Sequence, residues 1–513
     1  MDQNRFAHLF ADNITLNPLE LESVRHEIEA RTTAIHQLEL QIKVLKAESE
    51  KYQTLLSPLR RNLLPPEILG EIFNFSIRSA AESDSSASYQ LNTLCRVCKA
   101  WRAAALVKPA LWADVGWVCI DAPQSLDVGK VGEWLSRSGK VKKSLRIVGD
   151  HGAEDGPACP LLHSELRSLL ADGPPLDDLS LLCTYAECLE AVLSGIQSTS
   201  AKSQSCDSIH SLTLGMERAS AMSFGRVCCV LDRFPTLRAL SLDPSEYYEF
   251  IHDGELPESL PFGNLTTLSI TCDWPEALVL GILRNCAGLE TLTLDTHGCP
   301  RSYNPSYPHY LPILLPKLQT LQLKEVDLSS RDTEILRYLR APSLQTLDIG
   351  FYPLDRLLPD DYNMIDIGLD IASLVNERPN RTTNLQHLRL ESLAITSQGL
   401  YHILSTLPTL THLTLERLES DSRLFRDAHT LGTKLLPRLK TLRIHNASEL
   451  FKFKYSDVYE FLKKKKEGAT AESPDYLEEA EFTVPIKRRD YDDRYWYTSE
   501  LAKNGLRLSV ADV

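Results

Sequence analysis

The sequence has no long apolar run, no excess of basic residues and no secretory leader pattern. No stretch approaches the ~20 apolar residues that span a bilayer, so we expect no membrane-spanning helix. The N-terminal residues lack a basic segment followed by an apolar one, so we expect no secretory signal. With a net charge of −14, the chain has no basic footprint for nucleic acid. We therefore expect neither a membrane nor a nucleic acid as a partner.

Motifs of nucleophilic, metal and phosphate chemistry are also missing. The sequence contains neither a Gly-x-Ser-x-Gly elbow nor a His-Glu-x-x-His metal helix. Gly132 and Gly139-Lys140 enclose six residues instead of the four of a phosphate-binding loop. The fourteen histidines are scattered, without a nucleophile or carboxylate at a recurring spacing. We predict that the chain is not an enzyme and that it uses no cofactor or metal.

The twelve cysteines lack the regular spacing of a disulfide framework. Such cysteines are typical of reduced, mostly buried thiols, so we expect the protein in the cytosol or the nucleus. Cys95-x-x-Cys98 has the spacing of a metal or redox pair, but no second pair follows it, which favours packing in a helix core. Two basic runs, 463–466 and 487–489, are either nuclear signals or solvated surface.

A long heptad pattern begins near the N-terminus. Asn17-Pro18-x-Glu20 is typical of a capped helix start, and apolar positions then alternate steps of three and four for about five heptads. The pattern predicts a coiled-coil helix over 17–57, ended by Pro58. This helix either forms a homodimer, or folds back on its own protein or stays partly frayed. The seam consists of Leu21, Val24, Ile28, Arg31, Ile35, Leu38, Ile42, Leu45, Ser49, Tyr52 and Leu56.

Residues 58–118 combine short helical patterns with more apolar surface than one helix face needs. One helix is predicted to start at Leu64-Pro65-Pro66-Glu67, and a second is predicted over Leu94–Ala105. The polar insert Ser79–Tyr89 between them predicts a flexible loop. So few short helices bury too little surface to be stable alone. The surplus apolar surface either docks a partner or packs as the N-terminal cap of the domain that follows.

Three motifs follow one another in this stretch: Leu64-Pro65-x-Glu67-Ile68-Leu69, Val97-Cys98-x-x-Trp101 and Pro109-x-Leu111-Trp112. Their order resembles the F-box of the fungal F-box proteins with leucine-rich repeats. It implies a three-helix module, held together by Trp101 and Trp112, that binds the Skp-type adaptor of a cullin-RING ubiquitin ligase. The adaptor-binding residues that it implies are Leu64, Pro65, Pro66, Glu67, Ile68, Leu69, Ile72, Val97, Trp101, Pro109, Leu111 and Trp112.

From Leu176 onward a leucine pattern repeats along the chain. The motif L-x-x-L-x-L, with some isoleucine, recurs with most starts 24 to 33 residues apart. Helical patterns lie between the copies, and a lone strand-plus-helix copy would be too small to fold, so the copies must stack. We predict an α/β solenoid of leucine-rich repeats over 176–484, with a parallel sheet on its concave side. The copies begin at Leu176, Ile209, Leu237, Leu265, Leu289, Leu318, Leu344, Leu385, Leu410 and Leu439.

The segments on either side of the copies carry weaker patterns. Residues 119–175 are predicted to be a linker or a degenerate repeat, in which Leu145-x-Ile147 follows a helix over Val128–Ser136. Residues Leu477–Val484 predict an edge strand, and 485–513 a C-terminal tail.

Residues between the leucines of each strand should face the concave side. In the middle copies they are small and neutral, and towards the C-terminus they are charged. We predict that His387, Arg389, His412 and Arg443 bind a polar or acidic target segment; the alternative is a solvated face without a single site. Aromatic residues in the long loops, among them Tyr247, Tyr307 and Tyr352, either form one binding patch or pack against the rim.

Together these features predict a substrate receptor of an SCF-type (cullin-RING) ubiquitin ligase. The F-box-like stretch would dock the adaptor, and the repeats would hold a target protein close to the ligase. The alternative is a coiled-coil and repeat scaffold with no role in ubiquitination. The two differ in the apolar surface of Leu64–Ile72, which a cap packed in cis would bury and a docking module would leave open.

Overall fold

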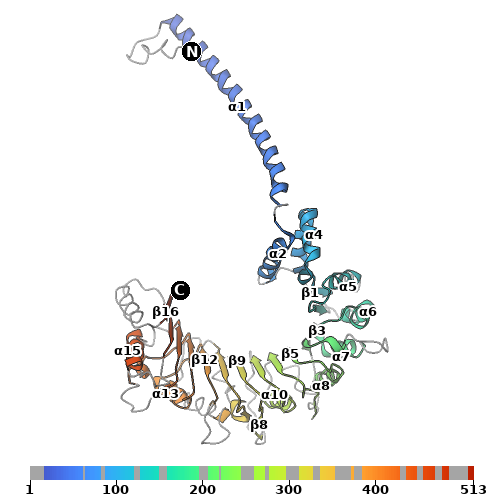
Figure 1. The fold of residues 1–513 in the computed structure, drawn as a ribbon, viewed down its shortest axis with the longest axis vertical. Coiled ribbons are helices and arrows are strands. Elements are labelled where there is room, and N and C mark those ends of the chain that lie inside the picture. The colour runs from blue at the N-terminus through green and yellow to red at the C-terminus, as the bar shows by residue number, and fades with distance from the viewer. Residues whose placement is uncertain are drawn as a thin grey trace. The chain divides into compact units, whose positions relative to one another are not determined.

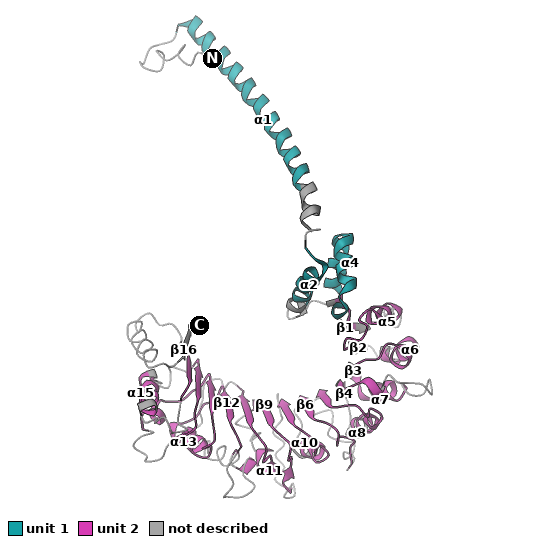
Figure 2. Ribbon diagram, viewed as in Figure 1, with its two compact units in different colours: residues 1–85, 89–111 teal, residues 86–88, 112–513 magenta. Residues whose placement is uncertain are grey.

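The computed structural model forms two compact units, residues 1–85 with 89–111 and residues 86–88 with 112–513 (Figure 2). Among the described residues, no helix has both the length and the apolarity to cross a membrane. The structure describes residues 17–61, 64–81, 87–120, 128–149, 159–195, 206–218, 221–243, 259–271, 276–295, 311–326, 335–352, 371, 373–374, 384–427, 435–446, 454–467, 477–484 and 507–512.

The first unit consists of a long helix followed by short ones (Figure 1). We call its described residues from 64 to 111 the helical module. The elements are α1 (Pro18–Arg61), α2 (Pro66–Ala81), α3 (Ala87–Val97), α4 (Lys99–Val107) and the 3-10 turn η2 (Pro109–Trp112), whose last residue belongs to the second unit.

Helix α1 begins at the predicted capping box. The Glu20 N–H donates to Oδ1 of Asn17 at 2.9 Å, and the Asn17 N–H donates to Oε2 of Glu20 at 3.0 Å. The helix continues through Pro58 to Arg61, so the prediction that Pro58 ends it is wrong. A proline this close to the end removes few hydrogen bonds, and the helix stops within one further turn. None of the α1 residues whose burial is described is buried.

The helical module is built on the packing of α2 against α4. Leu69 and Phe73, one turn apart on α2, are buried, and the Phe73 ring lies 5.1 Å from that of Trp101 on α4. A hydrogen bond of 3.2 Å joins α3 to α2, donated by Nε2 of Gln90 on α3 to Oγ of Ser76 on α2. The module therefore has a small core of its own, centred on Phe73.

The predicted helix over Leu94–Ala105 is two helices. Helix α3 ends at Val97 and α4 begins at Lys99, because Cys98 is extended and its Sγ accepts the N–H of Trp101 at 3.5 Å as an N-cap. The apolar periodicity continues across this break, so the pattern did not reveal it. The predicted loop Ser79–Tyr89 is helical at both ends, since α2 runs to Ala81 and α3 starts at Ala87; residues 82–86 lie outside the described residues.

The second unit is a solenoid of parallel strands in chain order, with a two-stranded sheet of β8 and β10 beside it. Each strand of the large sheet pairs with its sequence neighbours there, which confirms the predicted parallel-sheet solenoid. The strands are β1 (Asp114–Ile120), β2 (Ser144–Gly149), β3 (Asp178–Tyr185), β4 (Ser211–Arg218), β5 (Ala239–Asp243), β6 (Thr267–Thr271), β7 (Thr291–Asp295), β8 (Ile313–Leu314), β9 (Thr320–Val326), β10 (Leu339–Arg340), β11 (Thr346–Phe351), β12 (His387–Glu391), β13 (His412–Glu416), β14 (Thr441–His445), β15 (Glu479–Val484) and β16 (Arg507–Asp512).

Helices cover the outer face of the sheet, and the strands line its inner, concave face (Figure 1). The helix over 128–136 was predicted with its observed ends. The described elements are α5 (Val128–Ser136), η3 (Pro160–Leu162), α6 (Ser164–Asp172), α7 (Ala186–Gly195), η4 (Cys206–Ser208), α8 (Ala221–Val230), η5 (Leu231–Arg233), α10 (Glu276–Leu283), α11 (Ile335–Tyr338), α13 (Ser397–Ser405), α14 (Arg423–Asp427) and α15 (Tyr455–Glu467).

Each leucine-motif copy coincides with one strand, and the strands pair in register. Leu347 on β11, for example, lies opposite Leu321 on β9 and Leu388 on β12. The leucines are buried and the residues between them are partly exposed, in an alternating pattern along each strand. The leucine rows therefore form one continuous core, and the intervening residues form matching rows on the concave face.

Strands also occur beyond the ten motif copies. Strand β2 contains Leu145 and Ile147 of the predicted degenerate repeat, and β15 coincides with the predicted edge strand. Strand β1, within the stretch assigned to the F-box resemblance, pairs with β2 in the second unit. Strand β16 pairs with β15 inside the segment expected to be a tail. The sheet is thus longer at both ends than the leucine pattern predicts.

Candidate docking surfaces

Helix α2 presents an apolar face that the helical module leaves open. Ile68, Ile72 and Phe75 recur at i, i+4 and i+7, so they lie on one side of the helix. Ile68 and Ile72 are each 48% exposed and Phe75 is 77% exposed. Leu64, just before the helix, is also exposed. We call Leu64, Ile68, Ile72 and Phe75 the α2 face; its residues are neighbours of the buried pair Leu69 and Phe73.

The other residues implied by the F-box resemblance divide by burial. Leu69 and Leu111 are buried, so they stabilise the module and offer no surface to a partner. Trp101 is half-buried on α4, and its Nε1 is buried without a hydrogen-bond partner among the described residues. The remaining residues are exposed: Pro65, Pro66, Glu67, Val97 and Pro109.

Further large apolar side chains of the module are exposed outside the quoted motif. Tyr89 on α3 and Leu106 and Val107 at the end of α4 are exposed, as is Phe75. Only Phe75 carried a signal in the sequence, namely its helical spacing from Ile68 and Ile72. Leu106 and Val107 follow the helix break at Cys98, which the pattern did not reveal, and Tyr89 ends the insert that was predicted to be a loop.

Trp112 belongs to the second unit. It is buried, its ring centroid lies 4.7 Å from that of Trp134 on α5 in an edge-on contact, and the Arg137 guanidinium lies 4.7 Å from the same ring. Trp112 therefore packs on α5, and its predicted role in holding the helical module together stays a prediction. It anchors the start of the solenoid, because the chain turns from η2 into β1 directly after it.

The α2 face and the small helical core lie in a stretch of the chain that matches a known domain family. A family model of F-box-like domains matches residues 62–116. The match covers about a tenth of the 513-residue chain and includes the helical module and the start of β1. The α2 face therefore lies within an F-box-like domain. A search of curated proteins found no match.

Two solved structures share distant similarity with this chain. A Bacteroides fragilis protein shares 12% identity over 48% of this chain and 68% of that chain, with a TM-score of 0.25. The TLR13–ssRNA13 complex shares 15% identity over 75% of this chain, with a TM-score of 0.27. The chain spans 59% of the TLR13 chain, less than two thirds of its length. The fold assignment consequently rests on the strand order and register described above.

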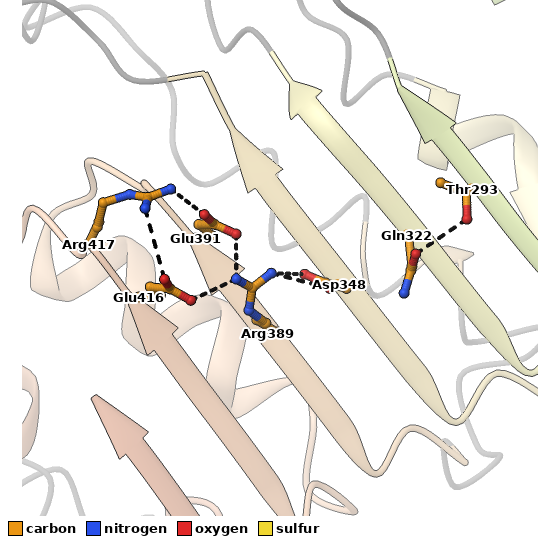
Figure 3. A network of polar contacts seen from close by, with 7 residues as sticks. All are labelled: Thr293, Gln322, Asp348, Arg389, Glu391, Glu416 and Arg417. Carbon is orange, nitrogen blue, oxygen red and sulfur yellow. Dashed lines mark hydrogen bonds and ion pairs between the residues drawn. The ribbon is translucent and has the colours of Figure 1, made fainter. Parts of the chain in front are cut away.

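The concave face carries a charged cluster on β11 to β13. Arg389 lies between three carboxylates, at 3.1 Å from Asp348, 2.5 Å from Glu391 and 2.6 Å from Glu416 (Figure 3). Arg417 pairs with Glu391 and lies 3.9 Å from Glu416. We call these five residues the Arg389 network. With two cations and three carboxylates, it carries a formal charge of −1.

The three carboxylates of the Arg389 network neutralise the charge of Arg389, which the sequence predicted to bind a polar or acidic target segment. Burial lowers the pKa of Arg389, but Glu416, Asp348 and Glu391 raise it by more, so the pKa lies above its usual range. Burial raises the pKa of the Asp348 carboxyl, although Arg389 opposes this effect. A target carboxylate at Arg389 must therefore displace one that is already bound there.

The remaining target-binding candidates occupy different surroundings. Arg443 on β14 also has carboxylate partners, at 3.6 Å from Glu479 and 3.0 Å from Glu481 of β15. Tyr352, just after β11, is 54% exposed. Tyr247 and Tyr307 lie outside the described residues, so the predicted aromatic patch stays a prediction.

His387 and His412 lie opposite each other on β12 and β13. Their rings are stacked, with centroids 4.1 Å apart and planes inclined by 17°. Burial lowers the pKa of His412; His387, Arg443 and Lys440 lower it further, while Glu478 raises it. Two stacked imidazoles beside Arg443 therefore disfavour a proton on His412.

We expect the stability of the solenoid to fall as the pH drops below about 6.5, where an unfolded histidine takes up a proton. The unfolded chain binds more protons than the folded one between about pH 6.5 and the lower folded pKa of His412, so stability rises with pH across that window. His412→Asn should flatten this slope in urea unfolding curves measured at several pH values. His36→Asn on α1 is the control and should keep it; equal slopes for parent and His412→Asn would contradict the expectation.

Proposed function

We propose that the chain is a substrate receptor of an SCF-type ubiquitin ligase. Its F-box-like domain would dock a Skp-type adaptor through the α2 face, and its solenoid would hold a target protein. The observation that carries this proposal is the exposure of Ile68 and Ile72 within the residues that match F-box-like domains. Apolar surface that a domain does not bury itself favours a partner.

The alternative function, a scaffold with no role in ubiquitination, predicts a buried α2 face instead of an exposed one. If the helical module served only as a cap, Ile68 and Ile72 would be packed within the chain, as Leu69 and Phe73 are. Their exposure supports docking. The chain would then act by proximity: it would raise the concentration of a bound target beside the catalytic subunits, and would perform no chemistry itself. We propose the cytosol or the nucleus as its compartment.

We expect Ile68→Ala/Ile72→Ala to weaken adaptor binding by about 10- to 100-fold. Each isoleucine is half-exposed in the free chain, so burying the pair in an interface is worth roughly 1.5–3 kcal/mol. The measurement is titration calorimetry of the full chain with a purified Skp-type adaptor. Leu40→Ala/Val44→Ala on α1, which also removes two exposed apolar side chains and lies off the heptad seam, is the control and should bind like the parent. A parent that does not bind the adaptor would leave only the scaffold function.

We further propose that α1 forms a homodimeric coiled coil, which would offer two target sites in one assembly. Its seam residues Ile28, Ile35, Leu38, Ile42 and Leu45 are all exposed. Exposed apolar residues at the a and d positions of a helix favour a second helix as partner. Arg31 occupies a seam position but pairs with Glu27 of its own helix at 3.0 Å.

Leu38→Asp/Leu45→Asp should convert the dimer to a monomer, because two charges at the seam would be desolvated in the dimer. Helix α1 provides a matched control. Leu40 and Val44 are exposed apolar residues off the seam, so Leu40→Asp/Val44→Asp makes the same chemical change and should leave the dimer intact. Light scattering after size exclusion reports the mass. A monomeric parent, or equal dissociation of both variants, would refute the dimer.

A further inference from the structure

Three cysteines from separate segments meet in the second unit. Cys183 is on the buried side of β3, Cys188 is in the first turn of α7, and Cys159 directly precedes η3. The turn η3 packs against α7 and β2, which brings Cys159 to the other two. Their Sγ atoms all lie within 4.8 Å of one another, and those of Cys159 and Cys183 are 3.5 Å apart. We call these residues the Cys159 cluster.

The geometry of the Cys159 cluster suits a metal ion better than a disulfide. With metal–sulfur bonds of about 2.3 Å, three thiolates around one ion lie about 3.8–4.0 Å apart, close to the separations here. A disulfide requires about 2.05 Å between two sulfurs and leaves the third cysteine over. Small movements of the side chains would therefore complete a three-sulfur site.

The chemistry of the cluster limits the kind of ion. Thiolate ligands select soft ions such as Zn²⁺, Cd²⁺ or Cu⁺. In a largely buried site the total charge must stay small, and three thiolates leave −1 with a divalent ion but −2 with a monovalent one. Cys159 and Cys183 are buried, whereas Cys188 is partly exposed and gives the site a side open to solvent.

Two thiols of the cluster, those of Cys183 and Cys188, have raised pKa values. The hydrogen bond with Cys159 and burial raise the pKa of Cys183, and burial raises the pKa of Cys188 to about 12. Reactive redox cysteines have lowered pKa values, so the cluster does not resemble a thiol switch. A bound metal ion would remove these protons itself, because a coordinated thiol is deprotonated outright.

We propose that Cys159, Cys183 and Cys188 form a three-thiolate binding site for a soft divalent metal ion of the zinc class. The site joins η3, β3 and α7, so a bound ion would crosslink consecutive repeats near the N-terminal end of the solenoid. The three cysteines lie outside residues 62–116 of the chain and outside the Arg389 network, and the proposal does not depend on either.

The test uses the full chain, reduced with a phosphine and stripped of metal. We expect the parent to bind one Cd²⁺ per chain with thiolate-to-metal charge-transfer absorbance, and Cd²⁺ to displace bound Zn²⁺. Zn²⁺ should also raise the melting temperature of the parent. Cys188→Ser should weaken Cd²⁺ binding more than about 10-fold, since even the loss of a group that supports a ligand costs that much. Cys286→Ser, a buried thiol outside the cluster, should bind like the parent.

Cadmium NMR of the unmodified parent counts the sulfur ligands without any variant, so the outcome does not depend on whether a variant folds. A chemical shift typical of three sulfurs supports the site. Cd²⁺ absorbance that is equal in the parent and in the triple serine variant of the cluster would overturn the proposal. So would the recovery of a Cys159–Cys183 disulfide in place of bound metal.

Discussion

Phe73→Ala is expected to unfold the F-box-like domain and to leave the solenoid folded. Phe73 is fully buried and contacts Trp101, and truncating such a side chain costs about 3–5 kcal/mol. A domain of about 50 residues is stabilised by roughly 3–8 kcal/mol in total. The substitution therefore removes most of that stability. The solenoid has its own leucine core in a separate compact unit, so we expect it to keep its structure.

Hydrogen exchange with mass spectrometry separates these effects by segment. In Phe73→Ala, amides of residues 66–107 should lose protection, and those of β3 to β14 should keep it. The chain offers a matched control in Phe75→Ala, two residues further along the same helix and 77% exposed. Phe75→Ala should change domain stability by less than about 0.5 kcal/mol, but it should weaken adaptor binding, because Phe75 lies on the α2 face. Equal loss of protection in both variants would contradict the division of α2 into two faces.

Leu347→Asp is expected to disrupt the middle of the solenoid. Leu347 is fully buried and lies opposite Leu321 and Leu388, so the new carboxylate would have only apolar neighbours in its row. An uncompensated buried charge costs about 3–5 kcal/mol, and the lost leucine adds about 2–5 kcal/mol. Each repeat of a solenoid is stabilised mainly by its neighbours. The loss at β11 should therefore spread to β9 and β12 and divide the array into two parts that unfold separately.

Urea unfolding of Leu347→Asp should accordingly show two transitions or a broadened one, at lower urea than the parent. Gln345→Asp is the matched control, since it introduces the same carboxylate two residues earlier at an exposed side chain. We expect it to unfold within about 0.5 kcal/mol of the parent. A single parent-like transition in Leu347→Asp would show that β11 does not couple the two halves of the sheet.

The sequence predicts the repeats well because their signal is local. Each L-x-x-L-x-L copy places its leucines on one side of one strand, and a parallel neighbour in register is the simplest way to bury them. Strands β1 and β16 lack that motif, and β1 pairs with β2 through an irregular register between Asp114 and Trp117. The sequence pattern also did not reveal the break between α3 and α4 at Cys98, because a cysteine N-cap leaves the apolar spacing unchanged.

The functional surfaces depend on contacts between distant residues, and these limit what the sequence predicts. Ile68 and Leu69 are adjacent and similarly apolar, yet one is half-exposed and the other buried, because α4 covers one side of α2. The charge of Arg389 is evident in the sequence, but its neutralisation by Asp348 and Glu416 requires the pairing of β11, β12 and β13. The Cys159 cluster likewise joins residues that no short motif connects.

The in-register pairing of the strands also sets a spacing for any segment that binds across them. Equivalent side chains on neighbouring strands, such as His387 and His412, recur about every 4.8 Å at the backbone. An α-helix laid across the strands advances about 5.4 Å per turn and falls out of step by roughly 2 Å over three strand-to-strand intervals. An extended peptide advances about 6.7 Å per two residues and falls out of step by roughly 6 Å. The spacing of the strands on the concave face is therefore close to the rise of one helical turn. An extended segment can place its side chains opposite the strands only at isolated positions.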